Sequence, residues 1–413
     1  MASQAIPIYA TTETFYVPTV QLVVRGQPLG AEVIRDLIEV TYKDNVNEID
    51  NFSIEINNWD ADYQTFKFAP PLKTADQDFT GIFDAGTEIE LWMGYQNQGN
   101  MRRMMVGIIT SLEPNFTESG APTLTISGLN EIQQLRGEQH TYSWTNTSDS
   151  DIATELGNKP VQQGQPGLGI PVDTNPASDE SADPFVFMNN QYDIVFLLER
   201  ARRHGYEMYL EDNPETGKKS LYFGLSQSNG NAPVYQLEWG RSLISFKPTL
   251  STAKQVNQVT VRGWDRTGNQ KIEVNYTLQN LWKDQGKSQA EITRLGQIAK
   301  AYANRTEVVT KPPVRTVAEA KQLARATLED QSKRLIEATG ATLGLPDLRA
   351  GCALEIIGFG IQTDADGNLS GTSSDFDGEY YVTESTHTIG SGGYRTQFSA
   401  RREGPVSLPG GGS

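Results

Sequence analysis

Two glycine-punctuated segments with the same order of strands and turns constrain the fold of this chain more than any other feature. The first runs from Phe83 to Gly128 and the second from Leu348 to Arg402. In each, β-branched and aromatic residues fill three stretches between glycine turns, which is typical of three successive strands. The sequence therefore predicts one β module that is used twice. The matched glycines are Gly86 with Gly351, Gly107 with Gly378, and Gly120 with Gly392.

Outside this module, the pattern of apolar residues divides the chain into regions. Residues 16–141 read as nearly pure β, with polar turns between alternating strands, which favours a first tube-like domain at 1–141. Residues 142–233 predict a small α/β domain, and residues 234–402 a second tube-like β domain with a helical insert at about 287–340. A flexible tail is expected at 403–413. The predicted fold class is mainly β with an α+β insert: two antiparallel barrel or sandwich domains, a small α/β domain and inserted helices.

Helical spacing of apolar residues predicts two long helices. One amphipathic pattern ends at Gly205, which is placed to stop a helix. Another predicts a helix from Val317 to Thr339, with Gly340 as its stop. We also expect the strand within residues 255–265 to be the counterpart, in the second β domain, of the strand within residues 50–60.

Composition excludes several classes of protein. A formal net charge of -16 argues against binding to nucleic acid or to an anionic membrane, because both partners require a basic surface. The single cysteine, Cys352, cannot form an intrachain disulfide and is expected to be a small buried hydrophobe. The first residues show no signal peptide, and no apolar run reaches about 18 residues, so we expect synthesis and folding in the cytoplasm without membrane anchoring.

Candidate catalytic and metal-binding residues are scattered. The three histidines, His140, His204 and His387, each stand alone, so neither a metal site nor a nucleophilic triad is expected. His204 is expected to cap helix carbonyls, and His387 to occupy an exposed or interface position on a strand. The segment beginning at Asp364 resembles a calcium loop but lacks its glycine and flanking helices, so a solvated loop is the competing interpretation. We expect no cofactor.

Two alternative functions are also compatible with the sequence, one enzymatic and one a binding function. A cell-wall polysaccharide hydrolase would need two carboxylates in one cleft, for which Glu113, Glu118 and Glu131 are candidates. A carbohydrate-binding module or adhesin would need exposed aromatic rings, for which Trp144 and Trp282 are candidates.

Duplication of the module has a geometric consequence. Three copies of a chain with two equivalent modules can present a nearly sixfold ring around a threefold axis. Such a homotrimer is a symmetry adaptor, because a hexameric tube fits one side and a trimeric partner fits the other. We therefore expect the chain to associate with itself.

Several segments together resemble one known family. They are FLLERARRHGYEMYLED, VNQVTVRGWD, AEAKQLARATLED, LRAGCALEIIGFG and YYVTESTHTIGSGGYRTQFSARR, in this order. The series resembles the phage late control D family, the baseplate hub proteins of contractile tails, which are related to the hub part of type VI and extracellular contractile injection system spikes. The resemblance covers about residues 20–402.

The resemblance implies a structural, non-enzymatic baseplate hub of a contractile phage tail or phage-like injection system. Its expected partners are itself as a homotrimer, a tail tube protein, a spike protein and other baseplate proteins, with no specific nucleic-acid binding. Its expected location is the baseplate of a virion or injection particle. Because the chain stops at Ser413, the spike is expected to be a separate polypeptide. The residues expected to set ring geometry and packing, or to serve only as ordinary turn and core residues, are Gly86, Trp92, Gly107, Gly351, Gly378 and Tyr381.

Overall fold

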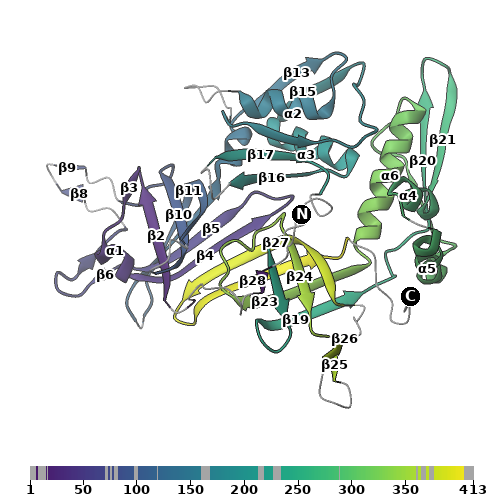
Figure 1. Ribbon diagram of the computed structural model, residues 1–413. Helices are drawn as coiled ribbons and strands as arrows, with labels where there is room; N and C mark the ends of the chain where they lie inside the picture. Colours follow the sequence, from purple (N-terminus) through teal and green to yellow (C-terminus); the bar gives the residue numbers. More distant parts are fainter. Residues whose placement is uncertain are drawn as a thin grey trace.

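The centre of the molecule is one sheet of fourteen strands, to which both halves of the chain contribute (Figure 1). The computed structural model describes residues 6–7, 15, 17–69, 73–74, 77–78, 82–96, 101–118, 120–159, 168–212, 218–226, 234–287, 289–359, 361–363, 369–371 and 376–403. Along the sheet the strands are β1 (Ile6–Pro7), β18 (Tyr235–Glu238), β24 (Ala353–Ile357), β27 (Gly378–Gly390), β4 (Leu37–Asn45), β5 (Asn51–Asn57), β12 (Thr123–Asn130), β11 (Arg102–Asn115), β10 (Glu88–Tyr95), β2 (Pro18–Val24) and β3 (Gln27–Pro28). A second branch leaves β27 through β28 (Gly393–Arg401), β23 (Ile336–Leu343) and β19 (Leu243–Leu250).

Alternating burial explains why these sequences form strands. In β5, Phe52, Ile54 and Ile56 are buried, whereas the two residues between them are half-buried. Side chains two residues apart lie on the same face of a strand, so one face of β5 packs on the core. The predicted mainly β class with an α+β insert is confirmed.

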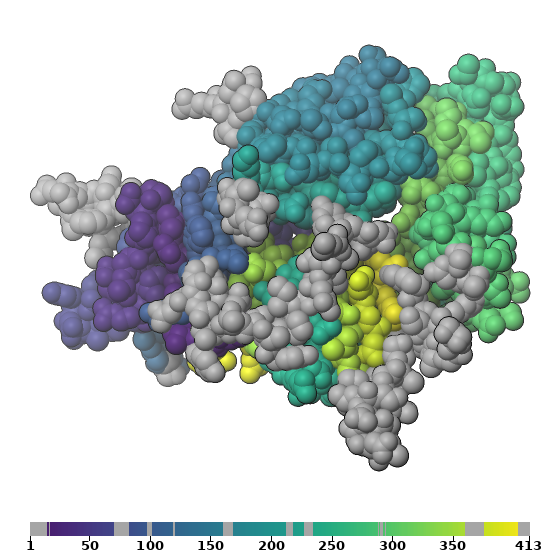
Figure 2. Space-filling model, in the orientation of Figure 1, coloured from purple at the N-terminus to yellow at the C-terminus, as the bar shows by residue number. Residues whose placement is uncertain are grey.

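An α/β unit forms a lobe above the sheet (Figures 1 and 2). Ser148 caps its first helix by accepting a hydrogen bond from the Asp151 amide at 3.1 Å. Gly205 ends its second helix with a φ of 71°, so the prediction of a helix ending there is confirmed. The elements of this unit are β13 (Gln139–Trp144), α2 (Asp149–Asn158), β14 (Val172–Asn175), β15 (Val186–Tyr192), α3 (Asp193–His204), β16 (Glu207–Asp212) and β17 (Lys219–Gly224).

A separate layer of helices and strands stands beside the sheet and the lobe (Figure 1). It contains a three-stranded sheet in the order β21-β20-β22, on which the longest helix packs. The elements of this layer are β20 (Gln258–Asp265), β21 (Gln270–Thr277), β22 (Thr306–Val309), α4 (Leu278–Asp284), α5 (Gln289–Ala299), η4 (Lys300–Tyr302) and α6 (Val317–Lys333).

The predicted helix from Val317 to Thr339 is wrong in its last part. Helix α6 ends at Lys333, and β23 follows with every second residue buried. Gly340 does not stop a helix. It lies within β23, where the ring of Phe398 fills the space a side chain would need, since a Cβ there would lie 2.4 Å from the Phe398 Cζ atom.

Small elements complete the described part of the chain. They are α1 (Ala31–Arg35), η2 (Glu131–Arg136), and the short strand pairs β6 (Trp59–Asp60) with β7 (Thr65–Phe66), β8 (Lys73–Thr74) with β9 (Gln77–Asp78), and β25 (Ile361–Thr363) with β26 (Leu369–Gly371). No helix in the described ranges is both long and apolar enough to span a bilayer.

Buried apolar side chains gather in several clusters, which follow the layers. One lies under β2, β4, β5 and β10–β12, a second inside the α/β unit, a third under β18, β23, β24, β27 and β28, and a fourth between α6 and the β20–β22 sheet. A smaller cluster of Val46, Tyr209, Tyr222 and Tyr381 connects the α/β unit to the large sheet.

Candidate assembly interface

Two sets of five strands follow the same order within the large sheet. We call β4-β5-β12-β11-β10 the first repeat and β19-β23-β28-β27-β24 the second repeat. If the five strands of a repeat are numbered along the chain, both repeats place them side by side in the order 1-2-5-4-3. The predicted duplication is therefore present and extends over five strands. The expected counterpart of the 50–60 strand is wrong, because β5 corresponds to β23, whereas β20 belongs to a different sheet.

The turns that open the module carry identical hydrogen bonds in the two repeats. The Gly86 amide donates to the Ile109 carbonyl at 2.7 Å, and the Gly351 amide donates to the Val382 carbonyl at 2.8 Å. Gly86 and Gly351 have φ values of 85° and 92°, a conformation that favours glycine. The match of these two glycines is confirmed.

A β-bulge lies at the same place in both repeats. The β11–β12 register shifts between Ile109 and Ser111, and the β27–β28 register shifts between Val382 and Glu384. The bulged residue is a threonine in each case, Thr110 or Thr383, whose hydroxyl donates to the carbonyl of a serine on the partner strand, at 3.4 Å and 3.2 Å respectively. Such bulges fix strand register, so they identify corresponding residues.

The match of Gly107 with Gly378 is wrong by this register. Gly107 lies opposite Ile89, and the residue that corresponds to Gly107 in the second repeat is Tyr380, opposite Leu354. Gly378 corresponds instead to Met105. The two glycines also act differently, because a Cβ on Gly107 would lie 2.3 Å from the Leu129 carbonyl oxygen, whereas Gly378 has a φ of 126°.

The two repeats meet along one edge of β27. One side of this strand pairs with β28, and the other side pairs with β24 at residues 378–381 and then with β4 at residues 384–389. We call the antiparallel contact between β27 and β4 the internal junction. Thr41 and Thr388 lie opposite each other there, with their hydroxyl oxygens 3.4 Å apart.

A buried charged cluster lies at the internal junction. Arg349, which precedes β24, donates to the Asp44 carboxylate at 2.5 Å and to the Met104 carbonyl at 3.0 Å. Its guanidinium also lies over the Tyr42 ring, 4.8 Å from the centroid. Asp44 is only 4% exposed and accepts a further hydrogen bond from the Ser385 hydroxyl. The cation thus comes from the second repeat and the carboxylate from the first, which holds the repeats in one register.

Two neighbours of this cluster have shifted pKa values. Burial, together with the nearby Asp44 carboxylate, raises the pKa of Asp50 to about 7. Burial lowers the pKa of His387 to about 4. The expectation that His387 is exposed or at an outer interface is wrong, because its neutral ring is fully buried. Its Nδ1 accepts from the Tyr394 hydroxyl at 3.0 Å, and its Nε2 donates to the Leu348 carbonyl at 3.2 Å.

The remaining predicted site residues lie in different surroundings. Trp92 is half-buried on β10 and donates to Glu90 at 3.1 Å. Tyr381 is buried beneath the α/β unit, where its hydroxyl donates to the Glu207 carboxylate. Gly351 also faces that unit, since a Cβ there would lie 2.7 Å from the Tyr209 ring. The structure therefore does not bring the six residues into one site, and their role in ring geometry stays a prediction.

Three of the other candidate residues, His204, Glu131 and His140, have charged partners, and two are exposed. His204 contacts the Asp149 carboxylate at 2.8 Å, so the expectation that it caps helix carbonyls is wrong. Glu131 accepts from Lys219 at 2.8 Å. Glu113 and Glu118 are exposed. His140 contacts Asp193 at 2.9 Å.

The predicted sugar-binding aromatic rings are not on the surface. Trp144 and Trp282 are 8% and 7% exposed, because each belongs to a buried apolar cluster. The proposed sugar platform on these residues is therefore wrong. Cys352 is half-buried just before β24, and burial raises the pKa of its thiol to about 12. The calcium-like loop from Asp364 lies largely outside the described residues, and among those described no group of three or more possible metal ligands occurs.

Solved structures of tail proteins share this architecture. A tail protein from Neisseria meningitidis MC58 matches with a TM-score of 0.61 and 16% identity, over 95% of this chain and 98% of that chain. The 43 kDa tail protein of prophage MuSo2 from Shewanella oneidensis matches with a TM-score of 0.60 and 15% identity, over 94% and 98%. An E. coli component of the type VI secretion system, itself similar to bacteriophage T4 tail proteins, matches with a TM-score of 0.53 and 11% identity, over 94% and 77%. The chain thus has a phage tail protein fold.

A family model gives a narrower assignment. The model of the Alg8 N-terminal domain matches residues 15–391. The chain belongs to the Alg8 N-terminal domain family. A search of curated protein sequences gave no match.

Proposed function

We propose that this protein is a structural baseplate hub of a contractile phage tail or phage-like injection system. Three copies form a ring that adapts a hexameric tail tube to a trimeric spike. The observation that carries this proposal is the five-strand duplication within one sheet, because two equivalent repeats per chain give a threefold assembly six similar units. The tail-protein fold of the similar structures supports the same role.

The proposed protein is a passive, load-bearing part without an enzymatic role. Its domains are the first tube-like β domain at 1–141, the α/β domain at 142–233, the second tube-like β domain at 234–402 and a tail at 403–413. Its partners are further copies of itself, a tube protein, a spike protein and other baseplate proteins. It is assembled in the cytoplasm of the producing cell and is located in the baseplate of the particle.

Light scattering coupled to size-exclusion chromatography tests the proposal. We expect a particle of about 137 kDa, three times the chain mass of 45.6 kDa. Pull-down with a tail tube protein and with a trimeric spike protein is the second measurement, and binding to both is expected. A strict monomer that binds neither protein would contradict the hub function.

A further inference from the structure

Two strands meet at the internal junction, β27 and β4. Each has a counterpart in the other repeat, and the edge of that counterpart corresponds to half of the junction. The β27 edge at residues 384–389 corresponds to the β11 edge at residues 111–116. Strand β4 corresponds to β19, and both of these strands have a β-bulge near their start. In the described part of the chain, residues 112–115 of β11 pair only with β12, and residues 245–250 of β19 pair only with β23. Among the described residues, neither edge therefore has a partner strand on the side that the internal junction uses.

We propose that β11 of one copy pairs antiparallel with β19 of a second copy, in the register of the internal junction. At the internal junction Thr388 lies opposite Thr41. Asn115 occupies the position of Thr388 in the first repeat, and Lys247 occupies the position of Thr41 in the second, so the proposed register places Asn115 opposite Lys247. The same transfer places Leu112 opposite Leu250. This inference rests on the proposed hub function, since it names the contact by which the copies join.

The side chains along the two edges match in this register. On the face that corresponds to the buried side of the internal junction, every pair is apolar on both strands, and on the other face every pair is polar. Leu250 is 40% exposed and Phe116 is 57% exposed, so both rows contain apolar surface that pairing would cover. A shift by one residue would place apolar side chains opposite polar ones. The apolar pairs are Leu112 with Leu250, Pro114 with Pro248 and Phe116 with Phe246, and the polar pairs are Glu113 with Thr249 and Asn115 with Lys247.

A proline on each edge restricts which strands can pair there. Pro114 and Pro248 have no amide hydrogen, so this pair adds no hydrogen bond and the flanking pairs hold the contact. Prolines are typical of edges that avoid unspecific pairing with other chains. Side-chain complementarity on both faces therefore has to select the partner.

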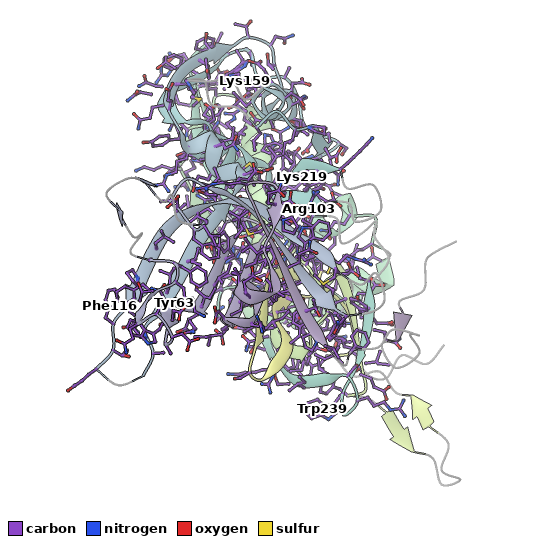
Figure 3. All side chains as sticks on the ribbon, turned by 90° about the vertical axis from the view of Figure 1, so that its left-hand side faces the viewer. Tyr63, Arg103, Phe116, Lys159, Lys219 and Trp239 are labelled. Carbon is purple, nitrogen blue, oxygen red and sulfur yellow. The ribbon has the colours of Figure 1, made fainter. Side chains whose placement is uncertain are left out.

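The two edges belong to separate parts of the surface, so they cannot meet within one chain. Figure 3 shows Phe116, which directly follows β11, at the left-hand side of the molecule. Trp239, which bridges to Leu243 at the start of β19, lies at another corner far from Phe116 in the same view. A contact between unlike edges is head-to-tail, and closure of such contacts forms a ring.

Disulfide trapping tests the register. The double variant Asn115→Cys/Lys247→Cys, oxidised at pH 8 and run without reductant, is expected to give covalent two-chain and three-chain species. The off-register pair Asn115→Cys/Thr249→Cys also uses two exposed positions. It is expected to give on the order of tenfold less product, because a shift of two residues exceeds disulfide reach. Wild type is the background control, since a Cys352 thiol with a pKa of about 12 stays protonated at this pH.

Further variants separate the possible results. Thr41→Cys/Thr388→Cys is expected to close within one chain, which checks the chemistry at the same strand geometry. Asn115→Cys and Lys247→Cys mixed as single variants are expected to give two-chain species only. Homodimers of Asn115→Cys alone would overturn the head-to-tail contact. A trimer by light scattering without in-register trapping would overturn the register and leave the hub function standing, whereas a strict monomer would overturn both.

Discussion

Two buried titratable residues at the internal junction affect stability in opposite directions as pH changes. The raised pKa of Asp50 means that its stabilising contribution is complete below about pH 4 and is lost as pH rises through about 7. The lowered pKa of His387 means that its contribution is complete above about pH 6.5 and is lost as pH falls through about 4. Over the shared pH range the two effects oppose each other, so the pH dependence of wild-type stability reports only their sum.

Replacement of Asp50 by asparagine should isolate the contribution of Asp50 to the pH dependence of stability. The Asn130 side-chain amide donates a hydrogen bond to the Asp50 carboxylate at 2.8 Å. An asparagine at position 50 has the same shape and an oxygen that can accept this bond, but it cannot ionise. The unfolding free energy of wild type minus that of Asp50→Asn should fall by up to about 4 kcal/mol between pH 4 and pH 7.5, at about 1.36 kcal/mol per pKa unit. Urea denaturation at a series of pH values measures this difference. A difference that stays constant with pH would show that Asp50 titrates normally.

Strand β23 contains a glycine, Gly340, that packs closely against an aromatic ring. The Phe398 ring lies directly against the backbone of Gly340 in this strand, and Phe398 is itself buried. The strand therefore depends on close packing at a residue whose local sequence also fits a helix stop.

Replacement of Gly340 by alanine should destabilise the second repeat. The new methyl group would overlap the Phe398 ring, and overpacking of a core typically lowers the unfolding free energy by about 1–3 kcal/mol. Gly392→Ala is the matched control, because nothing lies within 4 Å of a Cβ there, and we expect a change below about 0.5 kcal/mol. Denaturation by urea compares the two variants. Equal stabilities would contradict the packing role of Gly340.

Sequence predicts elements better than it predicts the contacts between them. The strand class, the Gly205 helix end and the match of Gly86 with Gly351 follow from local signals. The match of Gly107 with Gly378 fails because spacing along a strand does not tell which residues face each other across a pair. The Asp44–Arg349 contact joins positions 305 residues apart, and no local pattern marks either residue as a partner of the other.

The α/β unit is attached to the large sheet by a buried polar contact. The Tyr381 hydroxyl donates to Glu207, and Arg401 donates to the same carboxylate at 2.7 Å. Glu207 belongs to β16 and is 3% exposed, so its charge depends on both partners. The unit and the second repeat are therefore expected to unfold together.

Replacement of Tyr381 by phenylalanine should weaken this attachment. Loss of one hydrogen bond to a buried carboxylate should lower the unfolding free energy by about 1–3 kcal/mol. Tyr63→Phe, at a residue that is 82% exposed, is the control and should have no measurable effect. Chemical denaturation followed by tyrosine and tryptophan fluorescence reports both variants. An unchanged midpoint in Tyr381→Phe would show that the hydroxyl adds nothing to the contact.

The covalent link between the two repeats has a further consequence for assembly. Asp44 and Arg349 leave water together when a single chain folds, so the free energy of their desolvation does not depend on protein concentration. The outer edges of β11 and β19 hold only exposed charges, at Glu113 and Lys247. Fusion of two repeats into one polypeptide thus makes burial of the ion pair a unimolecular step, and it leaves the bimolecular steps to edges that can associate without stripping water from a buried charge.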